Sequence, residues 1–362
     1  MDYFPTMNWL KDIKVIDLST VLAGPSVASF LGELGAQVNK FESPHQGGDV
    51  TRSWRVPGEL TPEPVSAYFA SINYCKSYST IDLRDPSAQE QLHRLLSDAD
   101  VLISNFKEED YDKFGLAAPL LRKAFPRLIH ARLRGFDSDP RRVAYDVVLQ
   151  AECGMMALNG SADGPPTKFP IAIVDVLAAH QMKEAILLAL FQRERSGQGC
   201  VLGASLEKAG IASLVNQASN YLMTGQLPQR MGSQHPNIAP YGDIFLCSDG
   251  QWIVLAIGSN RQFHDLCQVL GTIELPMDSR FEDNRQRVLH REALNESLSQ
   301  AFAQMASDVF MRQSKAQNIP AGVIRTMDQV MAIAKELKMI HQEDIEKIPT
   351  ARVKSIAFEI IA

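Results

Sequence analysis

The sequence predicts an α/β protein with two parts, a large domain with a Rossmann-like parallel sheet and a smaller α+β domain. Two observations support this fold class. Apolar strand patterns alternate with helical patterns through the N-terminal half, and such alternation predicts a parallel sheet with helices on both faces. A segment rich in Gly and Pro, residues 225–242, then separates this half from a hairpin pattern. A chain of 362 residues is also long for one domain.

The first elements form a βαβ unit of about 30 residues, the length expected for a parallel crossover. Pro25 fits the first helical position and Gly35 fits the end of the helix. The same alternation continues to about residue 136. The elements expected in order are a strand at 14–18, a helix at 26–36 and strands at 37–42 and 78–83, then a helix at 88–99, a strand at 100–106, a helix at 116–125 and a strand at 127–136.

Ligands of parallel sheets bind beyond the carboxyl ends of the strands. The loops that follow Leu18, Glu42, Asn105 and Arg134 should meet at that edge. We therefore expect a binding site there.

The expected domain boundaries follow from the linker. Residues 1–225 form the large domain, which residues 331–362 complete, and residues 226–330 form the linker and the small α+β domain. In the small domain, residues 243–259 predict a hairpin with its turn at Ser248. The stretch at 332–344 has a helical pattern.

Asp175 stands alone in the apolar run KFPIAIVDVLAAHQM, residues 168–182. PIAIV predicts a short strand, and a long helix would begin at Asp175. A charge in such surroundings is costly unless the structure pairs it or uses it. Asp175 could cap the helix, because an N-cap Asp accepts a backbone N–H and interacts favourably with the helix dipole. Its carboxylate could also take part directly in a reaction.

Composition argues against several classes of protein and site. The net charge is −6 without a basic stripe, so we expect no nucleic-acid partner. No apolar run approaches the roughly 20 residues of a membrane span, and the N-terminus lacks the pattern of a signal peptide. Five scattered cysteines indicate a reducing cytoplasm. The eight histidines lack metal-binding spacing, so no metal is expected.

A nucleotide-dependent dehydrogenase is disfavoured by the first βα turn. That turn reads AGP where the dinucleotide fingerprint requires GxGxxG, and a phosphate-binding GxxxxGK[ST] motif is also missing.

Several stretches, in order along nearly the whole chain, match one known family. They include LKDIKVIDLSTVLAGPSVASFLGELGAQVNKFE, SINYCKSYSTIDLRDP, ADVLISNF, AYDVVLQAECGMMALNG, PTKFPIAIVDVLAA and HPNIAPYGDIF. Together these stretches resemble the family III CoA-transferases. This group, also called the CaiB/BaiF family, includes formyl-CoA transferase and carnitine CoA-transferase.

The resemblance implies that Asp175 is the nucleophile of a CoA-transferase. A carboxylate would attack the acyl-CoA thioester, form a mixed anhydride and expel CoA as a thiolate, and an enzyme–CoA thioester would form on the same residue. The nucleophile and capping interpretations are compatible, because both place an anion at a helix N-terminus.

Racemases of the same superfamily use a histidine about thirty positions before that aspartate, and here the position holds Tyr145. Tyrosine is a poor base at neutral pH. In transferases that this chain resembles, this tyrosine lines the acyl pocket, so Tyr145 favours transfer. An acyl-CoA racemase and a non-catalytic CoA-binding subunit remain alternatives.

The resemblance also implies CoA contacts, a substrate loop and an assembly. An interlocked homodimer is expected, with acyl-CoA and a carboxylic acid as substrates. The loop over the active site would be Gly258, Ser259 and Asn260. The residues expected to contact CoA are Val21, Ala23, Lys76, Asn105, Phe106 and Lys113.

Overall fold

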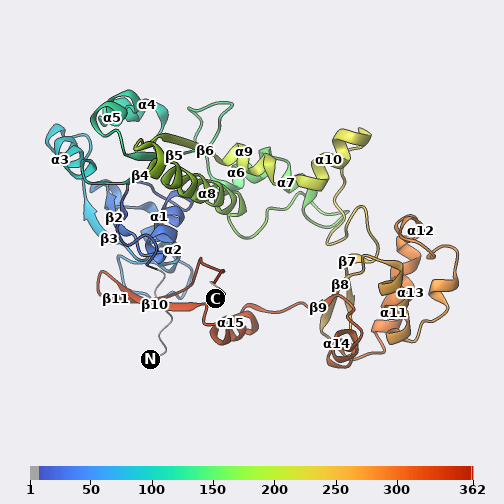
Figure 1. The fold of residues 1–362 in the computed structure, drawn as a ribbon. Helices are drawn as coiled ribbons and strands as arrows, with labels where there is room; N and C mark the ends of the chain where they lie inside the picture. The colour runs from blue at the N-terminus through green and yellow to red at the C-terminus, as the bar shows by residue number, and fades with distance from the viewer. Residues whose placement is uncertain (1–7, 360, 362) are drawn as a thin grey trace. The chain divides into compact units, whose positions relative to one another are not determined.

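The computed structural model describes residues 8–359 and residue 361 (Figure 1). The chain divides into two compact units. The first comprises residues up to 155, residues 168–225 and residues from 334 onwards, and the second comprises residues 156–167 and 226–333. No helix in the described part of the chain is both long enough and apolar enough to cross a membrane.

The first unit contains a six-stranded sheet in which all neighbouring strands are parallel. The strand order is β3-β2-β1-β4-β5-β6, the Rossmann order, so the expected fold class is confirmed. The strand order reverses between β1 and β4: β2 and β3 follow β1 on one side, and β5 and β6 follow β4 on the other. The strands are β1 (Lys14–Asp17), β2 (Gln37–Glu42), β3 (Ser77–Thr80), β4 (Val101–Ser104), β5 (Ile129–Arg134) and β6 (Val201–Ser205).

Helices cover both faces of this sheet, as Figure 1 shows. One face packs a core against α1 (Ala23–Glu33) and α8 (Ile173–Ser196), with α6 (Asp146–Glu152) and α9 (Leu206–Ala212) at its edge. The other face packs against α3 (Pro86–Leu96), α4 (Glu108–Lys113) and α5 (Ala118–Ala124). The first unit also contains α2 (Ala67–Ile72), α10 (Val215–Thr224) and the short 3₁₀ helices η1 (His45–Gly47) and η2 (Val50–Ser53).

The helix α1 begins two residues before Pro25, which had been expected at the first helical position. The first turn tolerates this proline because the N–H groups there have no intrahelical acceptor. The predicted end is confirmed, since Gly35 follows the helix in a left-handed conformation with φ of 100°.

The second unit has its own sheet and core. Three antiparallel strands, in the order β7-β8-β9, pack against helices, and the predicted hairpin corresponds to the first two strands. The elements are β7 (Tyr241–Leu246), β8 (Trp252–Ala256), α11 (Asn260–Leu270), η3 (Leu275–Met277), α12 (Asn284–Leu289), α13 (Arg291–Phe302), α14 (Ser307–Ala316) and β9 (Ala321–Val323). Two further helices, α7 (Met155–Leu158) and α15 (Met327–Glu336), lie where the chain passes between the units.

The helical pattern expected for residues 332–344 is only half correct. The helix α15 ends at Glu336, and an antiparallel hairpin of β10 (Ile340–Ile345) and β11 (Ile348–Val353) follows. This hairpin belongs to the first unit. Its Ile345 is buried with Phe69 of α2, and Arg352 lies 3.1 Å from Glu33 of α1.

A buried group of four charged side chains fixes the loop after β1, and we call it the charge cluster: Asp17, Lys40, Asp49 and Lys76. Lys76 Nζ lies 2.8 Å from Asp17 Oδ2, and Lys40 Nζ lies 3.2 Å from Asp49 Oδ2. All four side chains are almost completely buried. Burial lowers the pKa of Lys76 to about 8, although the Asp17 carboxylate opposes this shift.

The charge cluster is bonded to the backbone of that loop. Lys40 donates to the Ser19 carbonyl at 2.7 Å and Lys76 donates to the Pro25 carbonyl at 2.9 Å. Asp49 accepts from the Val21 N–H at 3.4 Å. Val21 has a φ of 72°, which is rare for a β-branched residue. The cluster therefore holds a strained turn in place.

We expect Asp17→Ala to lower the free energy of unfolding by roughly 3–5 kcal/mol, because two buried ammonium groups would lose a partner. Urea denaturation measures this loss. Asp98→Ala is the matched control, since Asp98 pairs with Lys14 at the surface and such a pair contributes only about 0–1 kcal/mol. Equal losses in the two variants would show that the charge cluster has no special role.

Candidate active site

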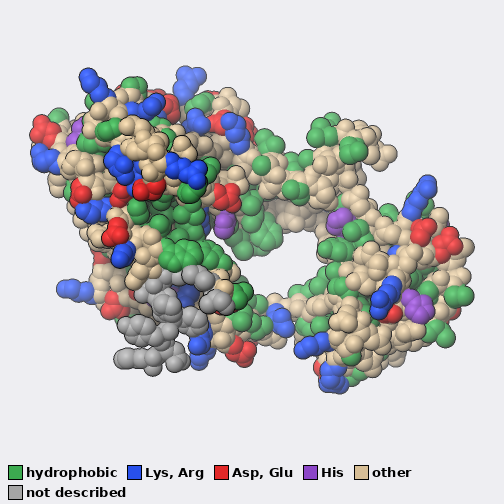
Figure 2. Space-filling view, viewed as in Figure 1, with side chains coloured by type: hydrophobic (Ala, Val, Ile, Leu, Met, Phe, Trp, Pro, Cys, Tyr) green, Lys and Arg blue, Asp and Glu red, His purple; other side chains and the backbone are tan. Residues whose placement is uncertain are grey.

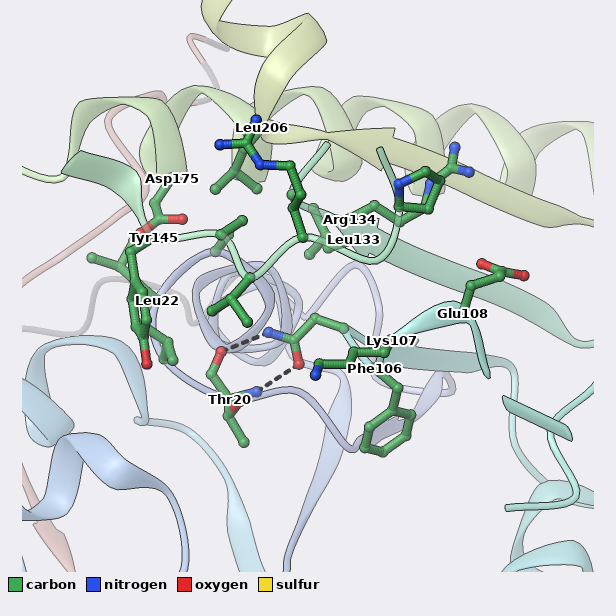
Figure 3. Close-up of a pocket in the computed structure, with 18 residues that line it drawn as sticks. Thr20, Leu22, Phe106, Lys107, Glu108, Leu133, Arg134, Tyr145, Asp175 and Leu206 are labelled. Atoms are coloured by element: carbon green, nitrogen blue, oxygen red, sulfur yellow. Dashed lines mark hydrogen bonds between the residues drawn. The ribbon is translucent and has the colours of Figure 1, made fainter. Parts of the chain in front are cut away.

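A cavity of about 230 Å³ opens at the carboxyl ends of β1, β4 and β5 in the first unit (Figure 3). This is the edge of the sheet where a ligand was expected. Two hydrogen bonds between Thr20 and Asn105 join the loops after β1 and β4 on its wall, with distances of 3.0 and 2.9 Å. The lining residues are Thr20, Val21, Leu22, Ala23, Asn105, Phe106, Lys107, Glu108, Leu133, Arg134, Gly135, Pro140, Arg142, Val143, Ala144, Tyr145, Asp175 and Leu206.

Asp175 lines this cavity from the first turn of α8. It is the third residue of the helix, and Ala172 occupies the N-cap position. The expectation that Asp175 starts and caps the helix is therefore wrong, and so is the strand expected at PIAIV, because α8 already begins at Ile173. The apolar run is the start of a buried helix, which periodicity alone does not separate from a strand.

Asp146, from the first turn of α6, supplies the missing cap. Its Oδ1 accepts the Val174 N–H at 2.7 Å and the Asp175 N–H at 3.4 Å. Its Oδ2 accepts a hydrogen bond from Gln150 Nε2 at 2.6 Å. No pattern in the residues around Asp175 indicates this role, because the capping carboxylate comes from another helix.

The environment of Asp175 favours its protonated form. The residue is only 7% exposed, and no described residue donates a hydrogen bond to its carboxylate oxygens. Burial, followed by repulsion from Asp146, raises the pKa of Asp175 to about 7. A carboxylate with such a pKa in a cavity is typical of a catalytic group.

Two tyrosines lie near this pair of carboxylates. Tyr145 lines the cavity and is 46% exposed. In Figure 3 its ring extends away from the Asp175 carboxylate. The sequence analysis missed Tyr68, which is half-buried in α2. Burial raises its pKa to about 12, and the negative charges of Asp175, Asp146 and Asp49 add to this shift.

Four of the six expected CoA contacts line the cavity. Val21 and Ala23 lie in the turn after β1 and at the start of α1, and Asn105 and Phe106 follow β4. The Phe106 ring contacts Phe114 edge to face, with 5.1 Å between the ring centroids. A flat apolar ring beside an amide therefore borders the cavity on the β4 side.

The two expected lysine contacts do not line the cavity. The Lys76 ammonium is fully buried and donates to Asp17, to Asn73 and to the Pro25 carbonyl. This burial contradicts the expectation that Lys76 contacts CoA. Lys113 is exposed at the end of α4, where it lies 2.9 Å from Asp110.

The expected substrate loop belongs to the second unit, where its own side chains hold it. The Ser259 hydroxyl caps α11 by accepting the Gln262 N–H, and the Gly258 N–H donates to Gln262 Oε1 at 2.9 Å. Asn260 Oδ1 accepts a hydrogen bond from the buried Arg287 at 2.8 Å. These bonds make the segment an ordered helix start within its unit.

Comparison with known proteins identifies the family. The family model described as CoA-transferase family III matches residues 10–360. The chain belongs to CoA-transferase family III. The resemblance inferred from the sequence is thereby confirmed.

Relatives of this family III CoA-transferase cover most of its length. It is 34% identical to a succinate–glutarate CoA-transferase of Agrobacterium fabrum, over 96% of this chain and 89% of the relative. It is 32% identical to a succinyl-CoA–D-citramalate CoA-transferase of Chloroflexus aurantiacus, over 95% and 86%. The crystal structure of a CAIB/BAIF family protein from Brucella suis matches with a TM-score of 0.81 and 36% identity, over 96% and 92%.

The raised pKa of Asp175 predicts a pH-dependent cost to stability. The folded state binds the proton of Asp175 up to about pH 7, whereas the unfolded chain releases it near pH 4. The stabilisation that this bound proton gives the folded state is therefore lost as pH rises from about 4 through 7. An Asp175→Asn variant lacks the effect. Between pH 5 and pH 8, its free energy of unfolding should rise relative to the wild type by roughly 2–3 kcal/mol.

Urea denaturation of both proteins at the two pH values measures this difference. A constant gap between them would contradict the raised pKa.

Proposed function

We propose that this family III CoA-transferase moves CoA from an acyl-CoA donor to a free carboxylic acid, with Asp175 as the nucleophile. The observation that carries the proposal is the placement of Asp175. Its carboxylate lies on the wall of the cavity at the start of α8, without a hydrogen bond from a described residue. Such a carboxylate is free to bond to a substrate.

In the first half of the proposed reaction, an Asp175 carboxylate oxygen attacks the thioester carbonyl, and the C–S bond breaks to release CoA as a thiolate. The product is a mixed anhydride between Asp175 and the acyl group. The thiolate then attacks the Asp175 carbonyl of this anhydride, so that the acyl group leaves as a free carboxylate and CoA is bound to Asp175 as a thioester. Covalent catalysis divides the transfer into simpler steps.

The second half repeats these steps in reverse with the acceptor. Its carboxylate attacks the Asp175–CoA thioester and expels the thiolate, which gives a new anhydride. The thiolate then attacks the acceptor's carbonyl, so that acceptor–CoA forms and the Asp175 carboxylate is regenerated. No net proton or electron is consumed. Only the ionised Asp175 attacks, so activity depends on a group whose pKa is about 7.

We further propose a dicarboxylic acid as the acceptor. The relatives described above are named for glutarate and D-citramalate, both of which carry two carboxylates, and succinyl-CoA or succinate appears in both names. These names support a succinyl-CoA-type donor and a short dicarboxylate acceptor for this chain.

Racemisation would require a second group that carries a proton to the α-carbon. Asp146 is poorly suited to that role, because its two oxygens already accept hydrogen bonds from Val174 and Gln150. Tyr145 occupies the place of the racemase histidine, and its phenol is a poor base near neutral pH. Both observations favour transfer over racemisation.

We propose an interlocked homodimer, in which the first unit of each chain binds CoA. Apolar side chains on α8 and α10 support an interface. Leu188 is 68% exposed and Phe191 is 55% exposed on α8, and Leu222 and Met223 of α10 are also exposed. Figure 2 shows hydrophobic side chains gathered on the surface around α8. Exposed apolar surface of this kind is typical of a protein interface.

Asp175→Ala should abolish CoA transfer from succinyl-CoA to glutarate, while the circular-dichroism spectrum stays unchanged. An assay of glutaryl-CoA formation measures this.

Hydroxylamine added with succinyl-CoA should modify the wild type at Asp175, because it captures acyl and thioester adducts. Retention of more than a few per cent of activity would overturn the nucleophile role. Solvent deuterium entering the α-carbon of a 2-methylacyl-CoA would instead support racemisation.

The homodimer should persist at nanomolar concentration, because two interlocked chains separate only after partial unfolding. Sedimentation velocity across a dilution series tests this. Leu188→Arg places a charge on the exposed face of α8 and should slow assembly during refolding, whereas Leu60→Arg, at a residue that is 93% exposed away from the helices, should not. A stable, active monomer in the dilution series would refute the interlocked dimer.

A further inference from the structure

We propose that a second cavity of the first unit binds the carboxylate of a short-chain organic acid. This cavity of about 220 Å³ lies beside β5, β6 and the start of α4, and we call it the arginine cavity. It is far larger than the roughly 10–15 Å³ that one water molecule needs. The residues that line it are Glu108, Arg132, Arg134, Val201, Leu202 and Gly203.

The arginine cavity is separate from the cavity that contains Asp175. Glu108 and Arg134 line both cavities, whereas Asp175, Tyr145 and the loop after β1 line only the first. In Figure 3, Glu108 lies on the opposite side of the first cavity from Asp175. The arginine cavity extends from there to β6, which is an edge strand of the sheet. A ligand in it would therefore bind away from the proposed nucleophile.

Arg132 supplies a buried positive charge to the arginine cavity. Its side chain is only 10% exposed, and its guanidinium lies 3.7 Å from the centroid of the Tyr111 ring and donates to the Leu116 carbonyl at 2.9 Å. The carboxylate that pairs with it, Glu108, lies 3.2 Å away and is 53% exposed, so solvent weakens the attraction. The charge of Arg132 is thus only partly compensated.

Both arginines keep unused hydrogen-bond donors. Arg132 and Arg134 are two residues apart on β5, so their side chains leave the same face of the sheet. The Nε atom of each is buried and has no hydrogen-bond partner among the residues that the structure describes. A buried donor without a partner is costly, and a ligand that accepts from it removes this cost.

The lining of the arginine cavity indicates the class of ligand. A guanidinium group matches the paired oxygens of a carboxylate or a phosphate. Two arginines and one glutamate leave one positive charge, which a carboxylate neutralises, whereas a phosphate dianion would leave an excess negative charge beside Glu108. Val201 and Leu202 add apolar surface for a hydrocarbon chain. A short-chain carboxylate meets all three conditions.

Gly203 keeps the arginine cavity open. It pairs with Arg132 in the register of β5 and β6, and a Cβ on it would lie 3.1 Å from Arg134 Nη2, the mobile end of a long side chain. Its φ lies outside the left-handed region, so the strand accepts a larger residue there. Gly203→Val would therefore fill the cavity and leave both arginines in place.

Ligand-observed NMR titration with butyrate tests the proposal. The wild type should bind butyrate, whereas neutral butyramide, which has a similar shape, should not bind. Gly203→Val fills the cavity and Arg132→Gln removes the buried charge, so each should weaken butyrate binding roughly tenfold or more. Arg127→Gln is the matched control, since Arg127 is an exposed arginine 3.7 Å from Glu194, and its affinity should stay within about twofold of the wild type.

Circular dichroism shows which variants fold, and Gly203→Val carries the test if loss of the buried Arg132 unfolds the chain. Unchanged butyrate affinity in Gly203→Val would overturn the proposal, and so would binding of butyramide equal to that of butyrate. Inorganic phosphate that displaces butyrate at an equal concentration would overturn the assignment to a carboxylate.

The arginine cavity and the proposed transfer reaction can be tested separately. Asp175→Ala should bind butyrate as the wild type does, because Asp175 does not line the arginine cavity. This result is expected whether or not the wild type forms glutaryl-CoA. Loss of butyrate binding in Asp175→Ala would place the acid in the first cavity and would overturn the proposal.

Discussion

The contact between Asp17 and Lys76 is the constraint on which the rest of the site depends. Two carboxylates and two ammonium groups in a protein interior are tolerated only when each has a partner, so the charge cluster admits little rearrangement. Its hydrogen bonds to the Ser19 and Pro25 carbonyls fix the turn that contains Val21. That turn is one wall of the cavity, and a strained conformation persists only where surrounding contacts enforce it.

The architecture followed from the sequence because alternating strands and helices permit few arrangements. Right-handed crossovers and the apolar strand patterns lead to a parallel sheet covered on both faces. The edge of that sheet was also predictable, and the cavity lies beside the loops that follow Leu18, Asn105 and Arg134. The loop after Glu42 was expected there too, but Glu42 is instead bonded to Arg52. The position of a glutamate in the sequence does not indicate which basic side chain it will pair with in the fold.

Details of the site that depend on contacts between distant segments could not be predicted. Asp146 caps α8 from another helix. Without that contact, the apolar residues before Asp175 have the pattern of a strand. Lys76 was expected to contact CoA because of its place in a motif, but its ammonium is buried against Asn73, three residues away, and Asp17, which is distant in the sequence. Motif resemblance identifies positions along the chain, whereas packing decides which side chains remain accessible.

The closeness of Asp146 and Asp175 has a consequence for the energetics of turnover. The ionised resting enzyme holds two carboxylates near each other at one helix end, and their repulsion destabilises it. In the proposed anhydride and thioester, Asp175 is an uncharged acyl group, so the repulsion disappears while Asp146 continues to cap the helix. The resting state is thus raised in free energy relative to the covalent intermediates. The repulsion between the two carboxylates in the free enzyme would then partly offset the free energy needed to form a reactive anhydride.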